Sequence, residues 1–165
     1  MGILTPSTSR PPKRSRAFVL IVLASVLLIG GWLFTNRKDD ATIIIIFPSG
    51  RQLEAEVADT PEKQLFGLAF RDGLPAGWAM LYIFETADYH RIGTKGYKVA
   101  VDLVWADEAR RVVHVLENAQ PCKEDPCPSY GPPPEKARYV LQAAAGIVRE
   151  ENVGPGIELK FVLKL

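Results

Sequence analysis

Residues 42–57 have the sequence TIIIIFPSGRQLEAEV, which is the pattern of a β-hairpin. Thr42–Phe47 is a continuous run rich in β-branched residues and predicts a buried strand. Pro48–Gly50 is a turn sequence. Apolar and polar residues alternate through Arg51–Val57, which predicts a second strand with one buried face. The domain that begins at residue 42 is therefore expected to be built mainly from β-structure.

Short strand patterns continue to the end of the chain, with one or two short helices between them. A helix is expected to start within residues 59–62, where a capping side chain is followed by proline. Leu65, Leu68 and Ala69 give this helix an apolar face, and it ends before Asp72. A second short helix is expected within residues 144–152. Further strands are expected at residues 79–84, 99–106, 111–117, 137–143 and 157–165.

Together these patterns predict an α+β domain with about seven strands. Residues 42–165 are enough for one domain with a modest core. The sequence has no strand–helix alternation of the parallel type. We therefore expect a mostly antiparallel sheet that forms a compact barrel or a sandwich.

An uncharged stretch precedes this domain. Ala17–Phe34 (AFVLIVLASVLLIGGWLF) is long enough to cross a bilayer as one helix, since about 20 apolar residues span the hydrocarbon. Basic residues without any acid precede it, whereas Arg37 and Lys38 are followed at once by two aspartates. This asymmetry predicts a cytoplasmic N-terminus and a periplasmic or extracellular main domain. The alternative is a cleaved secretory signal, but the run exceeds the usual length of about 7–15 residues and lacks a small-x-small cleavage pattern.

The chain is thus expected to have four parts. They are a disordered cytoplasmic tail at residues 1–16, a transmembrane signal anchor at 17–34 in contact with membrane lipid, a linker at 35–41, and an extracytoplasmic β domain at 42–165. Counting Lys and Arg against Asp and Glu gives +4 for residues 1–40 and −3 for residues 41–165. A mildly acidic domain without a basic stripe is not expected to bind nucleic acid.

Two cysteines, Cys122 and Cys127, lie in the domain. In an oxidising compartment we expect a disulfide that closes this small loop, with free thiols as the alternative. A zinc site would need His90 and His114 as further ligands from separate segments, without the paired spacing of zinc sites. No metal or other cofactor is therefore expected.

The domain resembles a known family in an ordered series of short sequence blocks. The blocks are DTPEK at 59–63, GL at 67–68, FR at 70–71, LP at 74–75, MLYIF at 80–84, VDLVWAD at 101–107, PC at 121–122, PCPSY at 126–130, ARYVL at 137–141 and AG at 145–146. In order and spacing they are similar to the pattern of the domain of unknown function 192 family, over about residues 45–165. The resemblance implies a small, mainly β domain, often exported or membrane-anchored, without an agreed biochemical activity.

One segment departs from the pattern of that family. The hallmark of the family is Phe-Trp-Met-Lys-Asn-Thr, followed by an aliphatic residue, Pro, an aliphatic residue and Asp. Residues 92–97 are IGTKGY instead, and Ala100 stands at the position of the proline. Lys95 and Asp102 are the polar members that remain. If the hallmark lines a site, its aromatic and thioether walls are missing from this chain.

Asp102 and Lys95 are the candidate catalytic residues. Asp102 is expected on an apolar strand face, and a carboxylate in such surroundings can serve as a general acid or base. The competing interpretation is a structural carboxylate that accepts backbone N–H bonds or pairs with Lys95 or Arg138. Lys95 stands beside Tyr97 in a glycine-rich loop, which either closes over an anionic ligand or is a solvated hairpin tip.

The loop at residues 118–136 is the candidate surface for a protein partner. Its prolines and the expected disulfide reduce the ordering entropy that is lost on binding, and Tyr130 is expected to be exposed. The competing interpretation is a rigid connection without a partner. His90 is expected in an exposed loop and His114 in the core.

Three functions are compatible with these features. The favoured one is a membrane-anchored binding or assembly module of the cell envelope, with a protein partner of the envelope and with Tyr130, Lys95, Tyr97 and Arg138 as the binding residues. The alternatives are an enzyme that acts on an envelope substrate with Asp102 as acid or base, and a structural relic of the family. The binding module is preferred because no nucleophile elbow, HExxH or Walker-type motif is present.

Overall fold

The computed structural model describes residues 18–28 and 42–163, in two compact units, Met1–Asp39 and Asp40–Leu165. In the first unit, residues 18–28 form a helix with exposed side chains. Within the described residues, no helix is both long enough and apolar enough to cross a bilayer. Residue 17 and residues 29–34 of the predicted anchor lie outside the described residues.

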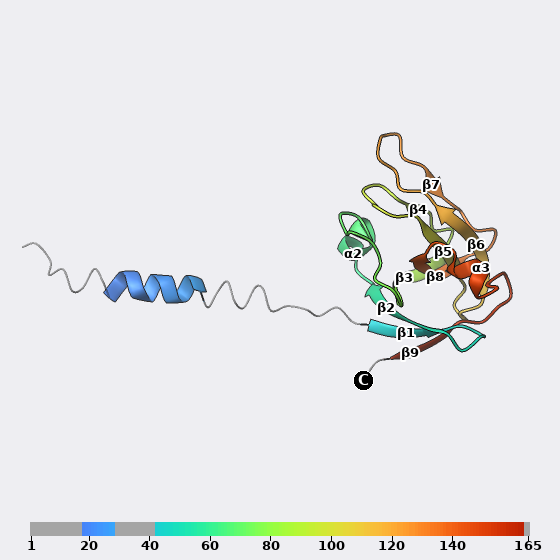
Figure 1. Ribbon diagram of the computed structural model, residues 1–165, viewed down its shortest axis with the longest axis horizontal. Helices are drawn as coiled ribbons and strands as arrows, with labels where there is room; N and C mark the ends of the chain where they lie inside the picture. The colour runs from blue at the N-terminus through green and yellow to red at the C-terminus, as the bar shows by residue number, and fades with distance from the viewer. Residues whose placement is uncertain (1–17, 29–41, 164–165) are drawn as a thin grey trace, which may run out of the picture. The chain divides into compact units, whose positions relative to one another are not determined.

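The second unit is mainly β, as predicted, and consists of a seven-stranded sheet, a two-stranded sheet and two short helices (Figure 1). The large sheet has the strand order β6-β5-β8-β3-β2-β1-β9. Its strands are β1 (Thr42–Ile46), β2 (Gln52–Ala58), β3 (Trp78–Asp88), β5 (Val101–Ala106), β6 (Val112–Ala119), β8 (Ala137–Ala144) and β9 (Lys160–Leu163). The small sheet pairs β4 (Ile92–Gly93) with β7 (Ser129–Tyr130). The helices are α2 (Pro61–Phe66) and α3 (Ile147–Glu150).

The large sheet is mixed, so the expectation of an antiparallel sheet was wrong at one pair of strands. β2 and β3 run parallel, in a register that extends from Glu54 opposite Trp78 to Ala58 opposite Tyr82. Parallel neighbours need a long crossover connection. Here the connection contains α2, which is too short to give a clear helix–strand alternation in the sequence.

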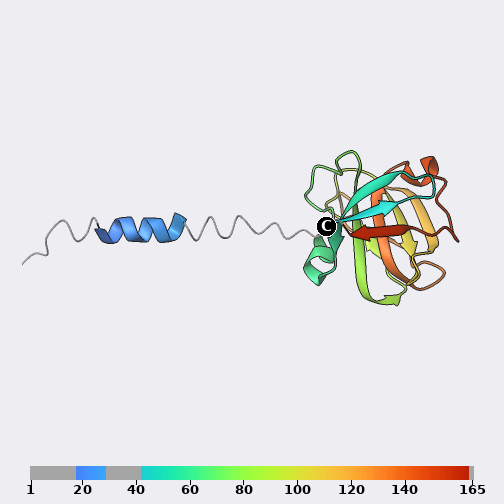
Figure 2. The ribbon, with the colours of Figure 1, turned by 90° about the horizontal axis from the view of Figure 1, so that it is seen from below.

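The sheet is strongly curved (Figure 2) but does not close into a barrel by continuous strand pairing. Its edge strands are β6 and β9, and they meet at one place through an isolated antiparallel bridge between Arg111 and Glu158. Beside this bridge, the Val112 N–H donates to the Ile157 carbonyl at 2.7 Å and the Leu159 N–H donates to the Arg110 carbonyl at 3.0 Å. The edges are therefore fastened at one end only.

Two groups of buried side chains lie on the two faces of the sheet. The first includes Ile45, Leu53, Leu81 and Leu141 together with the buried residues of α3. The second includes Met80, Tyr82, Leu103, Trp105 and Val140, and it also contains Leu68 and Ile92 from the segments that cover this face. β5 is buried along its whole length because it carries residues of both groups.

Helix α2 starts as the sequence predicts, but it ends earlier and does not bury the expected face. The Thr60 side chain accepts a hydrogen bond from the Lys63 N–H at 3.3 Å, with Pro61 in the first turn. The helix ends at Phe66, so Leu68 and Ala69 follow it rather than belonging to it. No residue within α2 is buried, and Leu65 is 79% exposed. Of the predicted apolar face, Leu65 is therefore exposed on the helix, and Leu68 is buried in the turn that follows it.

Candidate functional site

A cleft of about 290 Å³ opens between α2, β3 and the segment at residues 91–97. Helix α2 is held at this cleft by Gln64, whose side-chain amide donates to the carbonyls of Ala58 at 3.2 Å and Ile83 at 3.0 Å. These two carbonyls belong to the adjacent strands β2 and β3. The walls of the cleft include Gln64, Leu65, Tyr82, Arg91, Gly93, Lys95 and Tyr97.

The inner wall of the cleft carries two tyrosine hydroxyls next to a buried amide. The Tyr97 hydroxyl donates to Gln142 Oε1 at 2.8 Å, and Gln142 is fully buried in β8. Burial, together with the neighbouring Tyr97 hydroxyl, raises the pKa of Tyr82 well above its ordinary value. The Tyr82 hydroxyl is protonated at neutral pH, as that of an ordinary tyrosine is, and the raised pKa makes its ionisation still harder. Within the described residues, Gln142 Nε2 has no hydrogen-bond partner.

Gly67, at the end of α2, allows the two tyrosines to approach the backbone. It has φ = +48°, a conformation that glycine adopts readily. A Cβ atom at this position would overlap the Tyr82 hydroxyl and would lie 2.9 Å from the Tyr97 hydroxyl. The cleft wall thus requires glycine here for both the backbone angle and the space.

The mouth of the cleft is cationic. Arg91 and Lys95 both line it, and none of the residues that line it is acidic. The Arg91 guanidinium donates to the Ser129 hydroxyl at 3.2 Å and to the Ser129 carbonyl at 2.9 Å. Lys95 pairs with Asp125 at 2.6 Å, and both side chains are largely exposed. This Lys95 contact lowers the pKa of the Asp125 carboxyl. A carboxylate is thus already one of the partners of Lys95.

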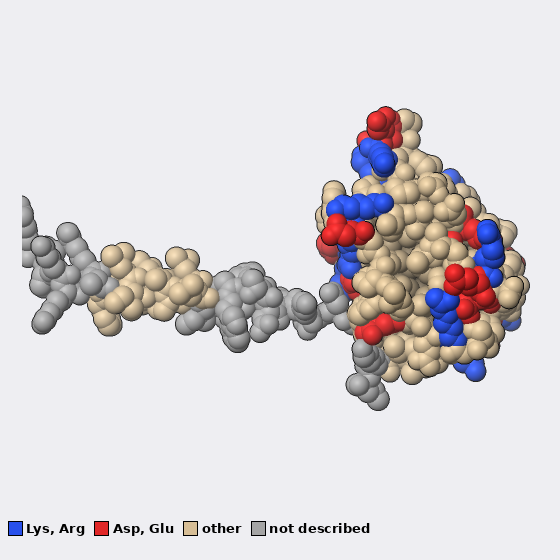
Figure 3. All heavy atoms as spheres, viewed as in Figure 1, with Lys and Arg blue, Asp and Glu red and all other residues tan. Residues whose placement is uncertain are grey.

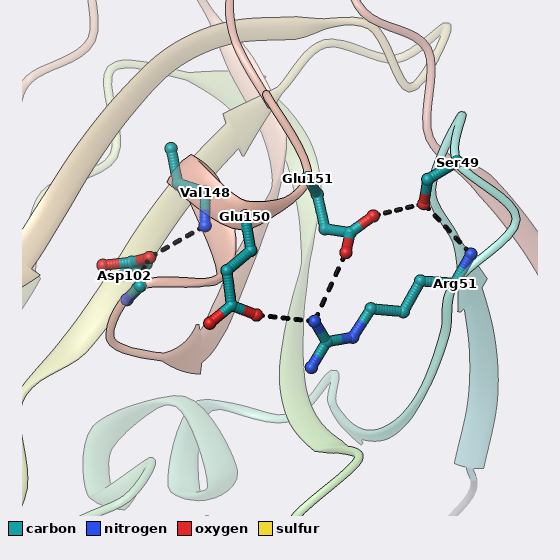
Figure 4. A network of polar contacts seen from close by, with 7 residues as sticks. Ser49, Arg51, Asp102, Val148, Glu150 and Glu151 are labelled. Atoms are coloured by element: carbon teal, nitrogen blue, oxygen red, sulfur yellow. Dashed lines mark hydrogen bonds and ion pairs between the residues drawn. The ribbon is translucent and has the colours of Figure 1, made fainter.

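Asp102 lies away from this cleft and is saturated by backbone donors. It is fully buried, and its carboxylate accepts from the Asn118 N–H at 2.8 Å and from the N–H groups of Gly146 and Val148 at 2.9 Å each. Figure 4 shows it against the first turn of α3. Asp102 therefore has the surroundings of a structural carboxylate, which was the competing interpretation of the sequence. Its partners are backbone N–H groups and not Lys95 or Arg138.

Helix α3 is also held from its other side by the β1–β2 turn (Figure 4). Arg51 contacts Glu150 at 2.6 Å and Glu151 at 3.3 Å, and the Ser49 hydroxyl donates to Glu151. Asp102 and Arg51 therefore fix the helix from two sides. We assign this network to the architecture of the domain.

The residues predicted to form a site are thus separated. Lys95 and Tyr97 line the cleft, whereas Asp102 does not. Tyr130 is only partly exposed; it packs against the second group of buried side chains, and its hydroxyl donates to the Gln120 carbonyl at 3.3 Å. Arg138 lies on β8 with its guanidinium 5.9 Å from the Tyr139 ring centroid.

The two histidines are both partly buried and both contact an aromatic ring. His90 stacks on Phe84, with ring centroids 3.5 Å apart, so it is less exposed than expected. His114 lies 5.2 Å from the ring of Trp105 at the margin of the core. Among residues 18–28 and 42–163, no three His, Cys, Asp or Glu side chains gather as metal ligands would.

The predicted disulfide between Cys122 and Cys127 is present. Its loop is fastened to the cleft segment, because the Cys122 N–H donates to the Thr94 carbonyl at 3.1 Å and the Thr94 hydroxyl donates to the Gln120 carbonyl at 2.7 Å. Cys122 and Lys123 also line an open groove of about 650 Å³, which adjoins the cleft at Leu65, Lys95 and Tyr97. The start of the loop therefore lines the groove beside the cleft.

Removing the disulfide should weaken the domain without unfolding it. Closing a loop this short stabilises a protein by about 2 kcal/mol through the entropy of the unfolded chain. We expect the Cys122→Ser/Cys127→Ser variant to lose about that much free energy of unfolding in urea titrations. Reductant should destabilise the wild type by the same amount as the double substitution does, and it should leave the variant unchanged. An equal response of both proteins to reductant would contradict this role of the bridge.

Comparisons with known proteins agree with the fold and with the sequence blocks. Residues 44–161 match the sequence profile of domain of unknown function 192, described as "Uncharacterized ACR". The chain belongs to the domain of unknown function 192 family. This confirms the resemblance that its sequence blocks indicated. A comparison with proteins of curated function gives no match.

Two crystal structures resemble this member of the domain of unknown function 192 family. One is a "putative transcription regulator" from Sinorhizobium meliloti 1021, with 25% sequence identity, a TM-score of 0.63, and coverage of 74% of this chain and 93% of that chain. The other is a protein of unknown function from Novosphingobium aromaticivorans DSM 12444, with 22% identity, a TM-score of 0.64, and coverage of 72% and 83%. They show that the fold is shared.

The cleft wall is also the segment in which this chain departs from the pattern of domain of unknown function 192. Gly93 stands where the hallmark has tryptophan, and a Cβ atom built on Gly93 would meet nothing within 4 Å. The cleft thus includes open space next to Gly93, where the family pattern has a tryptophan side chain. A large side chain at Gly93 would enter that space.

Sequence reasoning did not single out Tyr82, Arg91, Gly67 or Gln142. Gly67 and Tyr82 both belong to blocks that match the family, so a signal existed for them. Arg91 directly precedes the segment that departs from the family, and nothing in the sequence distinguishes it from other exposed arginines. Gln142 lies within a β-strand pattern, where burial of one polar residue cannot be detected from alternation alone.

Proposed function

We propose that this protein is a membrane-anchored, extracytoplasmic binding module of the cell envelope that holds a small anionic ligand in the cleft. The observation that carries the proposal is the charge of the cleft, which has Arg91 and Lys95 at its mouth and no acid in its lining. Carboxylate and phosphate groups form their strongest hydrogen bonds with such cations. The tyrosine hydroxyls of the inner wall add neutral polar groups beside them.

The location rests on the sequence and on the disulfide. The uncharged run at residues 17–34 and the excess of basic residues before it support an anchor with the domain outside the cytoplasmic face. The Cys122–Cys127 bridge supports an oxidising compartment, in which such bridges persist.

Binding is favoured over catalysis by the positions of the ionisable groups. Asp102, the candidate acid or base, has its carboxylate occupied by three backbone N–H groups. The Asp102 carboxylate points toward α3, whereas the Lys95 ammonium donates to the Asp125 carboxylate in the disulfide loop. The lining of the cleft offers cations, hydroxyls and an amide, which can bind and orient a ligand.

The test of this function is an anion titration that compares two glycine variants. Asp40–Leu165 is a compact unit with its own core, so this domain can be studied alone. In NMR titrations with inorganic phosphate and with succinate, we expect saturable shifts of the amides at residues 93–97. Arg91→Ala and Lys95→Ala should each weaken binding about tenfold, because each removes a charge-assisted hydrogen bond.

Gly93→Trp should abolish binding by filling the cleft, while Gly154→Trp should leave it unchanged. Gly154 is the matched control, because a Cβ atom built there also meets nothing within 4 Å and its φ is not positive. Equal affinity in the two variants, or no saturable shift with either anion, would overturn the proposal.

A further inference from the structure

Three large apolar side chains are exposed together beside the cleft. Leu65 and Phe66 at the end of α2 are 79% and 54% exposed, and Phe70 in the following turn is 77% exposed. All three line the open groove of about 650 Å³, together with Lys95 and Lys123. We call Leu65, Phe66 and Phe70 the α2 patch, and we infer that it rests on the surface of the lipid bilayer that holds the anchor.

The α2 patch lies at the end of the domain where the chain enters from the anchor. Thr42, the first residue of β1, pairs with Glu56 of β2. The Glu56 carboxylate binds the Arg71 guanidinium through two contacts of 2.6 Å, and Arg71 directly follows Phe70. The two views of the ribbon agree that α2 and the start of β1 lie at one end of the domain (Figures 1 and 2).

The length of the linker keeps this end close to the membrane. The inference rests here on the proposed function, because the anchor at residues 17–34 is part of it. Residues 35–41 can extend over at most about 25 Å. A domain of this size is roughly 35 Å across. A linker of this length limits the distance of Thr42 from the bilayer to about 25 Å, which is less than the width of the domain.

The chemistry of the patch suits a lipid surface. Leucine and phenylalanine side chains enter the boundary between headgroups and acyl chains, and lysine ammonium groups contact lipid phosphates. The groove has no acidic lining residue, and the Lys63 ammonium of α2 lies 4.0 Å from the Asp59 carboxylate. The face of the domain shown in Figure 3 carries side chains of both charges, separated by broad uncharged areas.

The direct test measures which end of the domain approaches the lipid. The full chain carrying Trp32→Phe is reconstituted into vesicles of phosphatidylcholine and phosphatidylglycerol whose lipids are brominated near the headgroup. Trp78 and Trp105 then provide a constant baseline in all proteins. In Phe66→Trp, we expect the bromolipids to quench at least half of the added fluorescence. In Pro48→Trp, at the opposite end of the β1–β2 hairpin, we expect no quenching.

A second measurement separates failure of the patch from failure of the anchor. If the full chain does not float with the vesicles, the proposed anchor fails. The isolated domain Asp40–Leu165 then tests the patch by co-flotation. The Leu65→Ser/Phe66→Ser/Phe70→Ser variant should bind these vesicles at least tenfold more weakly than the wild-type domain.

Equal quenching at positions 66 and 48, or equal partition of the triple variant and the wild type, would overturn the inference. Dimerisation of the domain that the triple variant abolishes would assign the α2 patch to a second copy of the chain and would also overturn it.

Discussion

The Asp102→Ala variant is expected to lose about 4 kcal/mol of its free energy of unfolding. The substitution leaves the N–H groups of Asn118, Gly146 and Val148 without their carboxylate acceptor; the Val148 bond is buried and the other two are partly buried. Each orphaned buried donor costs about 1–3 kcal/mol, and part of this is offset because a buried charge is removed. Urea titration would measure the loss, and the melting temperature should fall by about 15 °C.

The control for Asp102 is a second carboxylate that also contacts the region of α3. Glu117 binds Arg149 at 2.9 Å, but both side chains are well exposed. Exposed pairs of this kind contribute roughly 0–1 kcal/mol. Glu117→Ala should therefore leave the unfolding curve nearly unchanged. If Asp102→Ala were equally silent, the carboxylate would not be the element that holds α3 to β5 and β6.

The second large effect is expected for Gly67→Ala, which should cost about 3–4 kcal/mol and also eliminate anion binding in the cleft. The new methyl group has two costs. The backbone at residue 67 has a positive φ, which alanine disfavours. The methyl group also overlaps the Tyr82 hydroxyl, so the turn after α2 or the buried tyrosine ring must move. Either movement displaces the inner wall of the cleft.

Gly77→Ala separates these two costs. Gly77 has φ = +79°, but a Cβ atom there would meet nothing within 4 Å. This variant should therefore lose only about 1 kcal/mol, the cost of the backbone angle, and should bind anions normally. In the Tyr82→Phe background, Gly67→Ala should cost less than in the wild type, because the overlapping hydroxyl is gone. Similar losses at both glycines, or no recovery in the double variant, would show that the tyrosine is not the obstacle.

The strands were predictable because their signals are local. The β-branched run at residues 42–47 and the alternation at 51–57 correspond to β1 and β2, each displaced by a residue or less at most ends. The same holds for the start of α2, where Thr60 and Pro61 act within one turn. The disulfide was predictable because its two cysteines close a short loop.

The pairing of the strands was not predictable in the same way. Whether β3 lies parallel or antiparallel to β2 depends on the path of residues 59–77, which turn back after a helix of six residues. No residue in β2 or β3 carries that information by itself. The expectation of a barrel failed for a related reason. Whether β6 and β9 pair depends on contacts between residues far apart in sequence, and here these edges meet at one isolated bridge.

By itself the sequence determined the β-rich composition of the domain, the uncharged segment before it, its family, and the polar positions from which a site can be built. Only the tertiary structure decided which of those positions meet. It directs Asp102 to backbone donors at α3 and brings Lys95 together with Arg91, Tyr82 and Tyr97 at one cleft. The physical reason is that burial and partnership depend on the packing of elements that are distant in the chain, whereas strand and turn preferences arise from neighbouring residues.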